Sequence, residues 1–183
     1  NMIVYKFGGA SVKDAAAVRR LAEIVQSSKD NLVIVISAMD KITNHLEVVA
    51  ELFFHQDIRK YDEFEKIKNF HINIACELFD TPDHPAFHNL NRYFDDLFRQ
   101  IDKLPSADFD YEYDQIVSFG EIFSTLIVSH YLNDSQIFNQ WLDIKKYLKT
   151  DDHFREAKVD YEVSGRLINK AMNFEAAPVY VTQ

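Results

Sequence analysis

Two adjacent glycines follow the first apolar run of the chain, and a lysine stands just before them. Residues 2–7 are predicted to form a strand, so Lys6 lies near its carboxyl end and Gly8-Gly9 makes a tight turn. Backbone N–H groups in a glycine turn can approach an anion closely, because glycine has no Cβ. With the lysine ammonium, the hydroxyl of Ser11 and the start of the next helix, the turn predicts a phosphate cradle. The alternative is a plain turn beside a solvated lysine, and the residue types leave both open.

A hydroxyl-rich loop follows the second apolar run. Residues 32–36 are a continuous β-branched run, typical of a parallel strand covered on both faces, and the loop extends from Ser37 to Asn44. Ligands of open parallel sheets collect outside the carboxyl ends of the strands. Ser37 and Thr43 are therefore candidates for binding a small polar substrate. The alternative is an ordinary helix start with Thr43 or Asn44 as the N-cap.

One acidic side chain stands in an otherwise apolar helical pattern. Glu121 follows Gly120 within residues 113–132, whose apolar positions recur at helical spacing. A carboxylate in apolar surroundings costs free energy unless a cation or hydrogen-bond donors offset its desolvation. The ammonium group of a substrate would supply that partner, and an internal salt bridge would do so equally well.

Other candidate sites are weaker. His84 and His88 have a metal-like spacing, but the proline between them and the surrounding loop favour a surface turn. Cys76 is predicted to be a small core residue, and a single cysteine excludes an internal disulfide and a cysteine zinc cluster. The Asp151-Asp152 pair is more typical of a solvated loop or a helix cap. No metal-ligating residue is therefore predicted.

The elements that would position these residues follow an α/β pattern. Residues 2–7, 14–28 and 32–36 are predicted as strand, helix and strand, a βαβ unit whose helix is capped by Ser11 or Asp14. A largely helical block follows, with helices at 44–50, 57–79 and 88–104. Beyond it we expect a helix, or a short turn and a helix, at 113–132, short strands at 136–142 and 159–161, a helix at 162–174, and a strand at 178–182 with an uncovered apolar edge.

Length and composition exclude several classes of protein. With 183 residues, 47% hydrophobic and 27% charged, the chain has the values of a globular domain rather than a disordered or collagen-like one. No apolar run approaches the roughly 18–20 residues of a membrane span, and we expect no membrane partner. A formal net charge of −9 counts against a nucleic-acid partner but permits an anion in a local pocket. The single cysteine suits a reducing cytoplasm.

Four motifs follow one another along the chain. They are Lys6-Phe-Gly-Gly-Ala-Ser-Val12, Ile36-Ser-Ala-Met-Asp-Lys-Ile-Thr-Asn44, the segment from Gly120 to Ser124, and Asp143-Ile-Lys-Lys-Tyr-Leu-Lys-Thr-Asp151. In this order they resemble the motifs of the amino-acid kinase fold, and specifically those of the aspartokinases. The long helical block between the second and third motifs is also similar to aspartokinases. Two departures stand out: Asp40-Lys41 replace the family's usual glycines, and Lys145 replaces its usual arginine.

The resemblance implies an α/β fold, an amino-acid kinase-like three-layer sandwich with a mostly parallel sheet, here truncated, and a mostly helical insertion at about residues 44–110. It implies that residues 1–183 are the N-terminal part of one catalytic domain, without the nucleotide lobe and the regulatory ACT domains. At full length such a protein is expected to be a cytoplasmic homodimer.

The resemblance also implies a reaction. Aspartokinases transfer the γ-phosphoryl group of MgATP to the side-chain carboxylate of L-aspartate, giving 4-phospho-L-aspartate in the first step of lysine, threonine and methionine biosynthesis. ATP and Mg²⁺ are the implied cofactors and L-aspartate is the implied partner, whereas this segment by itself is expected to be inactive. Two alternatives stay open: another amino-acid kinase with a different acceptor, and a non-catalytic assembly fragment.

Positions that match the family's motifs carry the implied roles. Lys6 matches a catalytic lysine, and the ATP- and phosphate-binding segment is matched by Lys6, Phe7, Gly8, Gly9 and Ser11. Thr43 matches a substrate-contacting hydroxyl, with Ser37 as its neighbour in the same pocket. Glu121 matches the carboxylate that pairs with the aspartate ammonium.

Overall fold

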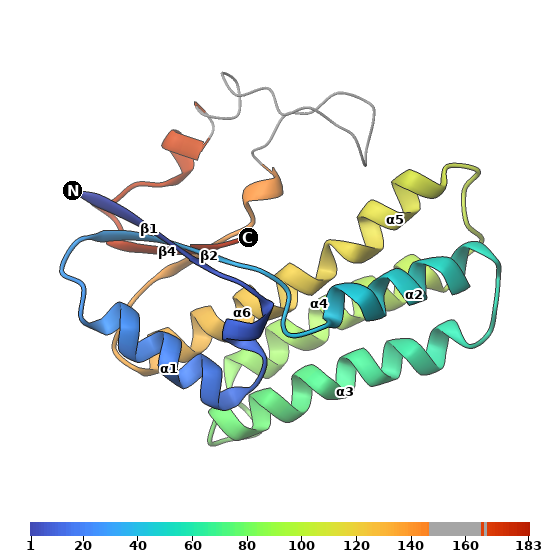
Figure 1. Cartoon of the computed structure of the whole chain (residues 1–183), viewed down its shortest axis with the longest axis horizontal. Coiled ribbons are helices and arrows are strands. Elements are labelled where there is room, and N and C mark those ends of the chain that lie inside the picture. The colour runs from blue at the N-terminus through green and yellow to red at the C-terminus, as the bar shows by residue number, and fades with distance from the viewer. Residues whose placement is uncertain (147–165, 167) are drawn as a thin grey trace.

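A four-stranded parallel sheet organises the described part of the chain. The computed structural model describes residues 1–146, 166 and 168–183 (Figure 1). The strands are β1 (Met2–Phe7), β2 (Asn31–Ile36), β3 (Gln140–Leu142) and β4 (Val179–Thr182), in the order β1-β2-β4-β3. All three pairings are parallel, and the predicted α/β class is confirmed.

The βαβ unit predicted near the N-terminus is present. β1 is followed by a short 3-10 turn, Gly9–Val12, and then by α1 (Ala15–Gln26). Of the two cap candidates the chain uses Asp14, whose side chain accepts a hydrogen bond from the backbone N–H of Ala17 at 2.8 Å. Helix α1 leads back to β2, which pairs with every residue of β1.

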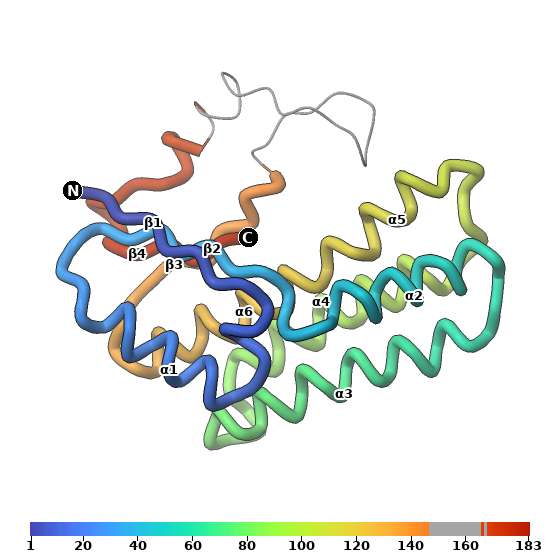
Figure 2. The backbone as a smooth tube through the Cα atoms, viewed as in Figure 1, coloured from blue at the N-terminus to red at the C-terminus, as the bar shows by residue number. Residues whose placement is uncertain are grey.

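Between β2 and β3 the chain forms a block of helices, as predicted. They are α2 (Ile42–Phe54), α3 (Lys60–Leu78), α4 (Pro85–Ile101), α5 (Phe109–Val117) and α6 (Phe119–Asp134). Residues 113–132 thus belong to two helices, which meet at Ser118. Figure 2 shows α2, α3, α4 and α5 extending together to one side of the sheet. In the described residues, no helix combines the length and hydropathy that a membrane crossing needs.

Helices cover one face of the sheet. Leu32, Ile34 and Ile36 of β2 point to that face, and register aligns the first two with Val179 and Val181 of β4. These five side chains belong to the main hydrophobic core together with apolar residues of α1 and α6, which lie below the sheet in Figure 1. The sheet and its helical layer therefore form one continuous core from which the loops at the strand ends project.

Two local predictions are wrong. Helix α2 has Lys41 as its N-cap residue without a side-chain hydrogen bond, so neither Thr43 nor Asn44 caps it. Both side chains instead lie exposed in its first turn. Cys76 is exposed rather than buried, because α3 turns other residues, among them Ala75, toward the core.

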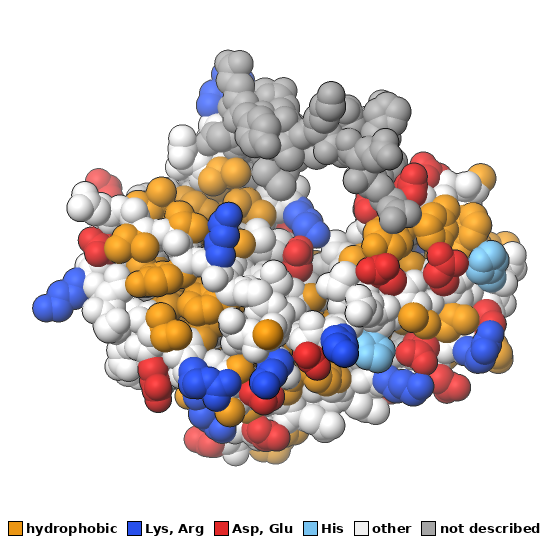
Figure 3. Space-filling view, viewed as in Figure 1, with side chains coloured by type: hydrophobic (Ala, Val, Ile, Leu, Met, Phe, Trp, Pro, Cys, Tyr) orange, Lys and Arg blue, Asp and Glu red, His pale blue; other side chains and the backbone are white. Residues whose placement is uncertain are grey.

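The apolar edge of the sheet differs from the expectation. β4 lies between β2 and β3 with all four residues buried, so the uncovered edge predicted at 178–182 is wrong. The exposed apolar edge belongs to β1, where Met2 and Val4 are 58% and 48% exposed. Hydrophobic side chains gather over this region in Figure 3. The strand predicted at 159–161 and part of the helix predicted at 162–174 fall outside the described residues, whereas residues 168–171 are helical.

A histidine is fully buried among aromatic rings. His71 of α3 packs against Phe123, with the ring centroids 4.9 Å apart, and also against Phe94. Its Nδ1 lies 2.7 Å from the carbonyl oxygen of Ile67, so Nδ1 donates the hydrogen bond in the neutral ring. Nε2 has no hydrogen-bond partner among the described residues. Burial lowers the pKa of His71 to about 4.

We expect His71 to make the fold sensitive to acid. An unfolded histidine has a pKa of about 6.5, and the folded value is about 4. Above about pH 6.5 the ring is neutral in both states and costs nothing, whereas below it only the unfolded ring takes up a proton. The free energy of unfolding should therefore fall by roughly 3 kcal/mol by about pH 4 through this residue.

Urea unfolding of the chain from about pH 8 down to about pH 4 measures this loss. His71→Phe is the matched variant, because it keeps an aromatic ring at the position and cannot be protonated. As the pH falls, the unsubstituted protein should lose more unfolding free energy than the variant, so the stability of the variant relative to it should rise. A difference that stays constant with pH would show that His71 does not titrate between folded and unfolded states.

Candidate functional site

The loops after β1 and β2 are held together by backbone hydrogen bonds. The N–H of Ser37 donates to the carbonyl of Phe7, and the N–H of Asp40 donates to the carbonyl of Gly9, both at 3.0 Å. A Cβ on Gly9 would lie 2.8 Å from the carbonyl oxygen of Asp40 and 2.9 Å from that of Ala38. Glycine is therefore needed at position 9 by the packing of the two loops.

The neighbouring glycine has no such reason in the described structure. Gly8 has φ −75° and ψ 175°, an extended conformation that any residue adopts. A Cβ added to it would meet no described atom within 4 Å. The backbone at Gly8 is thus open to solvent, which agrees with both interpretations of the sequence, the phosphate cradle and the plain turn.

A short 3-10 turn separates the glycines from the predicted helix. Gly9–Val12 spans four residues, and α1 begins at Ala15. The N–H of Ser11 is already used, because it donates to the carbonyl of Gly8 at 3.0 Å. So short a turn carries little of a helix dipole. Lys6 and the open backbone of Gly8 remain as the candidate anion-binding features of this loop.

Parallel pairing aligns the carboxyl ends of the strands in one row. Lys6 is in register with Val35, Val35 with Thr182, and Thr182 with Leu142. Adjacent strands are about 4.8 Å apart, so the row from β1 to β3 spans roughly 14 Å. The phosphate-cradle candidates stand at one end of this row, and the segment after β3 stands at the other.

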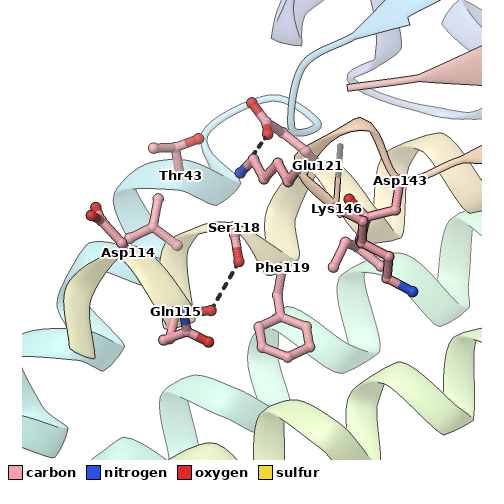
Figure 4. A pocket seen from close by; sticks show the side chains of 11 residues that line it. Thr43, Asp114, Gln115, Ser118, Phe119, Glu121, Asp143 and Lys146 are labelled. Atoms are coloured by element: carbon pink, nitrogen blue, oxygen red, sulfur yellow. Dashed lines mark hydrogen bonds and ion pairs between the residues drawn. The ribbon is translucent and has the colours of Figure 1, made fainter. Parts of the chain in front are cut away.

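An open pocket of about 660 Å³ lies at the start of α2 and α6 (Figure 4). Its walls are Thr43, Asp114, Gln115, Val117, Ser118, Phe119, Glu121, Ile122, Asp143, Lys145 and Lys146. Two of the predicted substrate residues, Thr43 and Glu121, therefore share one pocket although 78 positions separate them in the chain. The other predicted site residues are not among its walls: Lys6, Phe7, Gly8, Gly9, Ser11 and Ser37.

The carboxylate of Glu121 is paired and partly exposed. It lies in the first turn of α6, and its Oε2 is 3.1 Å from Nζ of Lys145 (Figure 4). The side chain of Glu121 is 36% exposed and that of Lys145 is 45% exposed. The expected apolar burial of this carboxylate is therefore wrong, since α6 turns it toward the pocket and turns its apolar residues toward the core. The pair is the internal salt bridge left open by the sequence, and it leaves the carboxylate accessible to a ligand.

Close packing fixes the start of α6. A Cβ on Gly120 would lie 2.9 Å from Cβ of Ala38 and 3.0 Å from Cδ1 of Leu46. The hydroxyl of Ser124 donates to the carbonyl of Ser37 at 2.8 Å. Glu121 lies between these two anchors, so the loop after β2 sets the position of its backbone.

Hydrogen bonds from the end of β4 hold the segment that follows β3. The hydroxyl of Thr182 donates to the carbonyl of Leu142 at 2.6 Å. Gln183 donates through Nε2 to Oδ1 of Asp143 at 2.7 Å, and its Oε1 accepts from the N–H of Ile144 at 3.2 Å. These bonds hold the short 3-10 turn Ile144–Lys146, which carries the lysine of the ion pair.

Several pocket residues were missed by sequence reasoning. Asp114, Gln115, Ser118 and Phe119 line the pocket because α5 ends and α6 begins there, and no motif in the sequence marks that junction. Lys145 had a signal, because it occupies the arginine position of the fourth motif. Residues 147–151 of that motif, and the Asp151-Asp152 pair, lie outside the described residues.

Of the two histidines with a metal-like spacing, His84 has a structural role. His84 caps α4, accepting through Nδ1 from the N–H of Ala86, and its Nε2 donates to Asp134 at 2.8 Å. His88 is exposed. Burial, with a smaller contribution from His84, lowers the pKa of nearby His130. Across residues 1–146, 166 and 168–183, no three His, Cys, Asp or Glu side chains gather as a metal site would require.

The sequence and the structure are similar to proteins of one family. The family model described as "Amino acid kinase family" matches residues 1–182. Lysine-sensitive aspartokinase 3 of Escherichia coli is 30% identical over 161 residues, which are 87% of this chain and 34% of that protein. The aspartokinase of Chlamydia trachomatis is 29% identical over 158 residues, which are 86% of this chain and 34% of that protein.

Solved structures agree with these matches. A crystal structure of E. coli aspartokinase III in complex with aspartate and ADP is similar with a TM-score of 0.83 at 28% identity. That similarity covers 100% of this chain and 40% of the other. The chain spans about a third of the length of the E. coli and C. trachomatis aspartokinases that it matches.

The two adjacent glycines should respond differently to the same substitution. Gly9→Ala brings a methyl group against two carbonyl oxygens and should lower the free energy of unfolding by roughly 1–3 kcal/mol. Gly8→Ala meets no described atom and stiffens only the unfolded chain, so it should leave that free energy unchanged or raise it by about 0.4–1 kcal/mol. Urea unfolding of the three proteins measures both effects, and equal losses in the two variants would contradict the packing derived for Gly9.

Proposed function

The chain belongs to the amino acid kinase family, and we propose that it forms the acceptor-binding and phosphate-binding part of an aspartokinase. The proposed reaction is transfer of the γ-phosphoryl group of ATP to the side-chain carboxylate of L-aspartate, a step of lysine, threonine and methionine biosynthesis. Its main support in the structure is that Thr43 and Glu121 line one pocket. The names of the relatives and the order of the four motifs support the same acceptor.

Charge, rather than proton transfer, is the chemical difficulty of this reaction. The acceptor carboxylate is already ionised at neutral pH, so it can attack phosphorus without a general base. It must instead be brought against a polyanionic triphosphate. Catalysis then depends on positioning the two reactants in line and on neutralising the charge of the transferring group.

Each candidate residue has a role in that scheme. Lys6 would neutralise phosphate charge, and the open backbone at Gly8 would let a phosphate approach. Glu121 would bind the substrate ammonium, while Thr43 would offer its hydroxyl group to a polar atom of the substrate. These groups bind and orient the reactants, and none of them needs to move a proton.

ATP and Mg²⁺ would be the cofactors. The open backbone at Gly8 leaves room for a phosphate group. Mg²⁺ usually enters such sites with the phosphates and takes most of its ligands from phosphate and water oxygens. When bound, it would reduce the negative charge that the attacking carboxylate meets.

The chain matches only part of its relatives, and this suggests how the whole protein is divided into domains. We propose that residues 1–183 are the N-terminal part of one catalytic domain, with a helical insertion at about 44–110. In the relatives about two thirds of the length lies elsewhere, since the match covers 34% of each. We propose that the remainder of the nucleotide site, the regulatory domains and part of a homodimer interface lie there.

The acceptor can be identified with the protein expressed from its complete reading frame. An ADP-release assay with MgATP should show turnover with L-aspartate and strongly reduced turnover with N-acetyl-L-aspartate, which lacks the ammonium group that Glu121 would bind. Residues 1–183 alone should show no aspartate-dependent turnover. A preference for another amino acid would favour the alternative of a kinase with a different acceptor, and no turnover with any of them would favour an assembly role.

Removing the lysine at the end of β1 should abolish most of the activity. Lys6→Ala is expected to lower kcat by roughly 10²–10⁴-fold, because one cation that stabilises a transferring phosphoryl group contributes several kcal/mol. Lys6 is exposed at the sheet edge, so the fold should survive. Lys13→Ala, which removes another exposed lysine shortly after the 3-10 turn, is the matched control. A folded Lys6→Ala protein with near-normal kcat would remove Lys6 from the mechanism.

A further inference from the structure

We propose that Lys145 is a positioning residue of the acceptor pocket: it holds one oxygen of Glu121 and leaves the other for the substrate ammonium. Nζ of Lys145 lies 3.1 Å from Oε2 of Glu121, and both side chains line the pocket. A carboxylate has about four lone-pair positions on two oxygens, so one ammonium does not saturate it. The inference rests on the function proposed above and adds a residue to its acceptor site.

Stability alone does not account for this pair. Lys145 and Glu121 are 45% and 36% exposed, and solvent-exposed ion pairs add little to folding. A long lysine side chain also loses rotamer freedom when it is held in one place. What the pair does is fix the direction of a carboxylate that would otherwise move freely at the mouth of the pocket.

The backbones on both sides of the pair are anchored independently. Glu121 stands on the first turn of α6, which Gly120 and Ser124 pin against the loop after β2. Lys145 stands on the 3-10 turn that Gln183 holds through Asp143 and Ile144. The ion pair therefore joins two separately anchored segments at the pocket. Further along α6, a hydrogen bond from Nε1 of Trp141 to Oγ1 of Thr125 links the helix to β3.

The charges around the pocket make a cation at this place useful. Asp114 and Asp143 also line it, and an aspartate substrate would bring two further carboxylates. Asp143 accepts a hydrogen bond from Gln183, which holds its carboxylate at the pocket wall. Lys145 offsets part of this negative charge next to Glu121, at the position where the resemblance places an arginine. A positive side chain is thus expected at this position, with lysine and arginine equivalent in sign.

Steady-state kinetics can distinguish a positioning role of Lys145 from a purely structural one. In the protein expressed from its complete reading frame, Lys145→Met should raise the KM for aspartate by about tenfold, within the range of coupling between contacting residues. The KM for ATP and kcat should change by less than about twofold, because neither phosphate nor the transition state depends on this contact. Lys145→Arg should restore the aspartate KM to within about twofold of the unsubstituted protein, since it restores the charge.

A matched control tests whether any lost charge has the same effect. Lys29→Met removes an exposed lysine in the turn between α1 and β2, outside the walls of the pocket. It should leave the aspartate KM unchanged. An equal rise in both variants would assign the effect to net charge and would overturn the inference.

The double variant shows whether Lys145 acts through Glu121. Glu121→Gln alone should raise the aspartate KM, and adding Lys145→Met should raise it little further, because the contact is already broken. Two effects that multiply would mean that Lys145 binds the substrate directly, and would overturn the positioning role. An unchanged KM in Lys145→Met would overturn it as well. Failure of the unsubstituted protein to use aspartate would instead refute the proposed function, and the inference with it.

Discussion

The site depends on the close approach of three backbone segments at Ala38. The loop after β1 reaches it through Gly9, and the start of α6 reaches it through Gly120. At both glycines a Cβ would lie under 3.0 Å from an atom of Ala38, a distance that side-chain carbons do not tolerate. Two of the three glycines in the described residues are therefore used to bring the loops at the strand ends together. Because these loops carry the candidate residues, backbone packing precedes any chemistry here.

Parallel pairing explains why positive charge gathers where an acidic chain needs it. The net charge of the sequence is −9, which would repel a triphosphate as a whole. Yet Lys6 ends β1, and Lys145 and Lys146 follow β3, so all three stand at the carboxyl-end edge of one parallel sheet. Ligand affinity in such a fold depends on the few charges at this edge and not on the total. Glu121 of α6 pairs with Lys145 near the same edge, so side chains of both signs lie there.

Local features were predictable from the sequence, and long-range ones were not. The βαβ unit and the helical block follow from residue periodicity over short windows. The cap rule narrowed the N-cap of α1 to Ser11 or Asp14, and the structure uses Asp14. The central place of β4 could not be predicted, because strand order depends on pairing between residues far apart in the chain. The predicted burial of Cys76 was wrong for a related reason. The sequence of a helix does not show which of its faces another helix covers.

The candidate site shows the same division. The motifs pointed to Thr43 and Glu121, and the structure places both in one pocket. They did not reveal the Lys145 partner of Glu121, since nothing in either local segment encodes a contact across 24 residues. The walls supplied by the junction of α5 and α6 were equally hidden, because a pocket arises from the angle between elements and not from a residue pattern.

Gly8 differs from the other two described glycines, because no contact or backbone conformation in the described structure requires a glycine there. Gly9 and Gly120 are explained by contacts, and their replacement would force backbone or core atoms to shift. Gly8 has an ordinary extended conformation and an empty space where its Cβ would be. Glycine in such a place costs conformational entropy on folding and returns no packing. Under the proposed function, a phosphate group would occupy this space, and Lys6 would offset its negative charge.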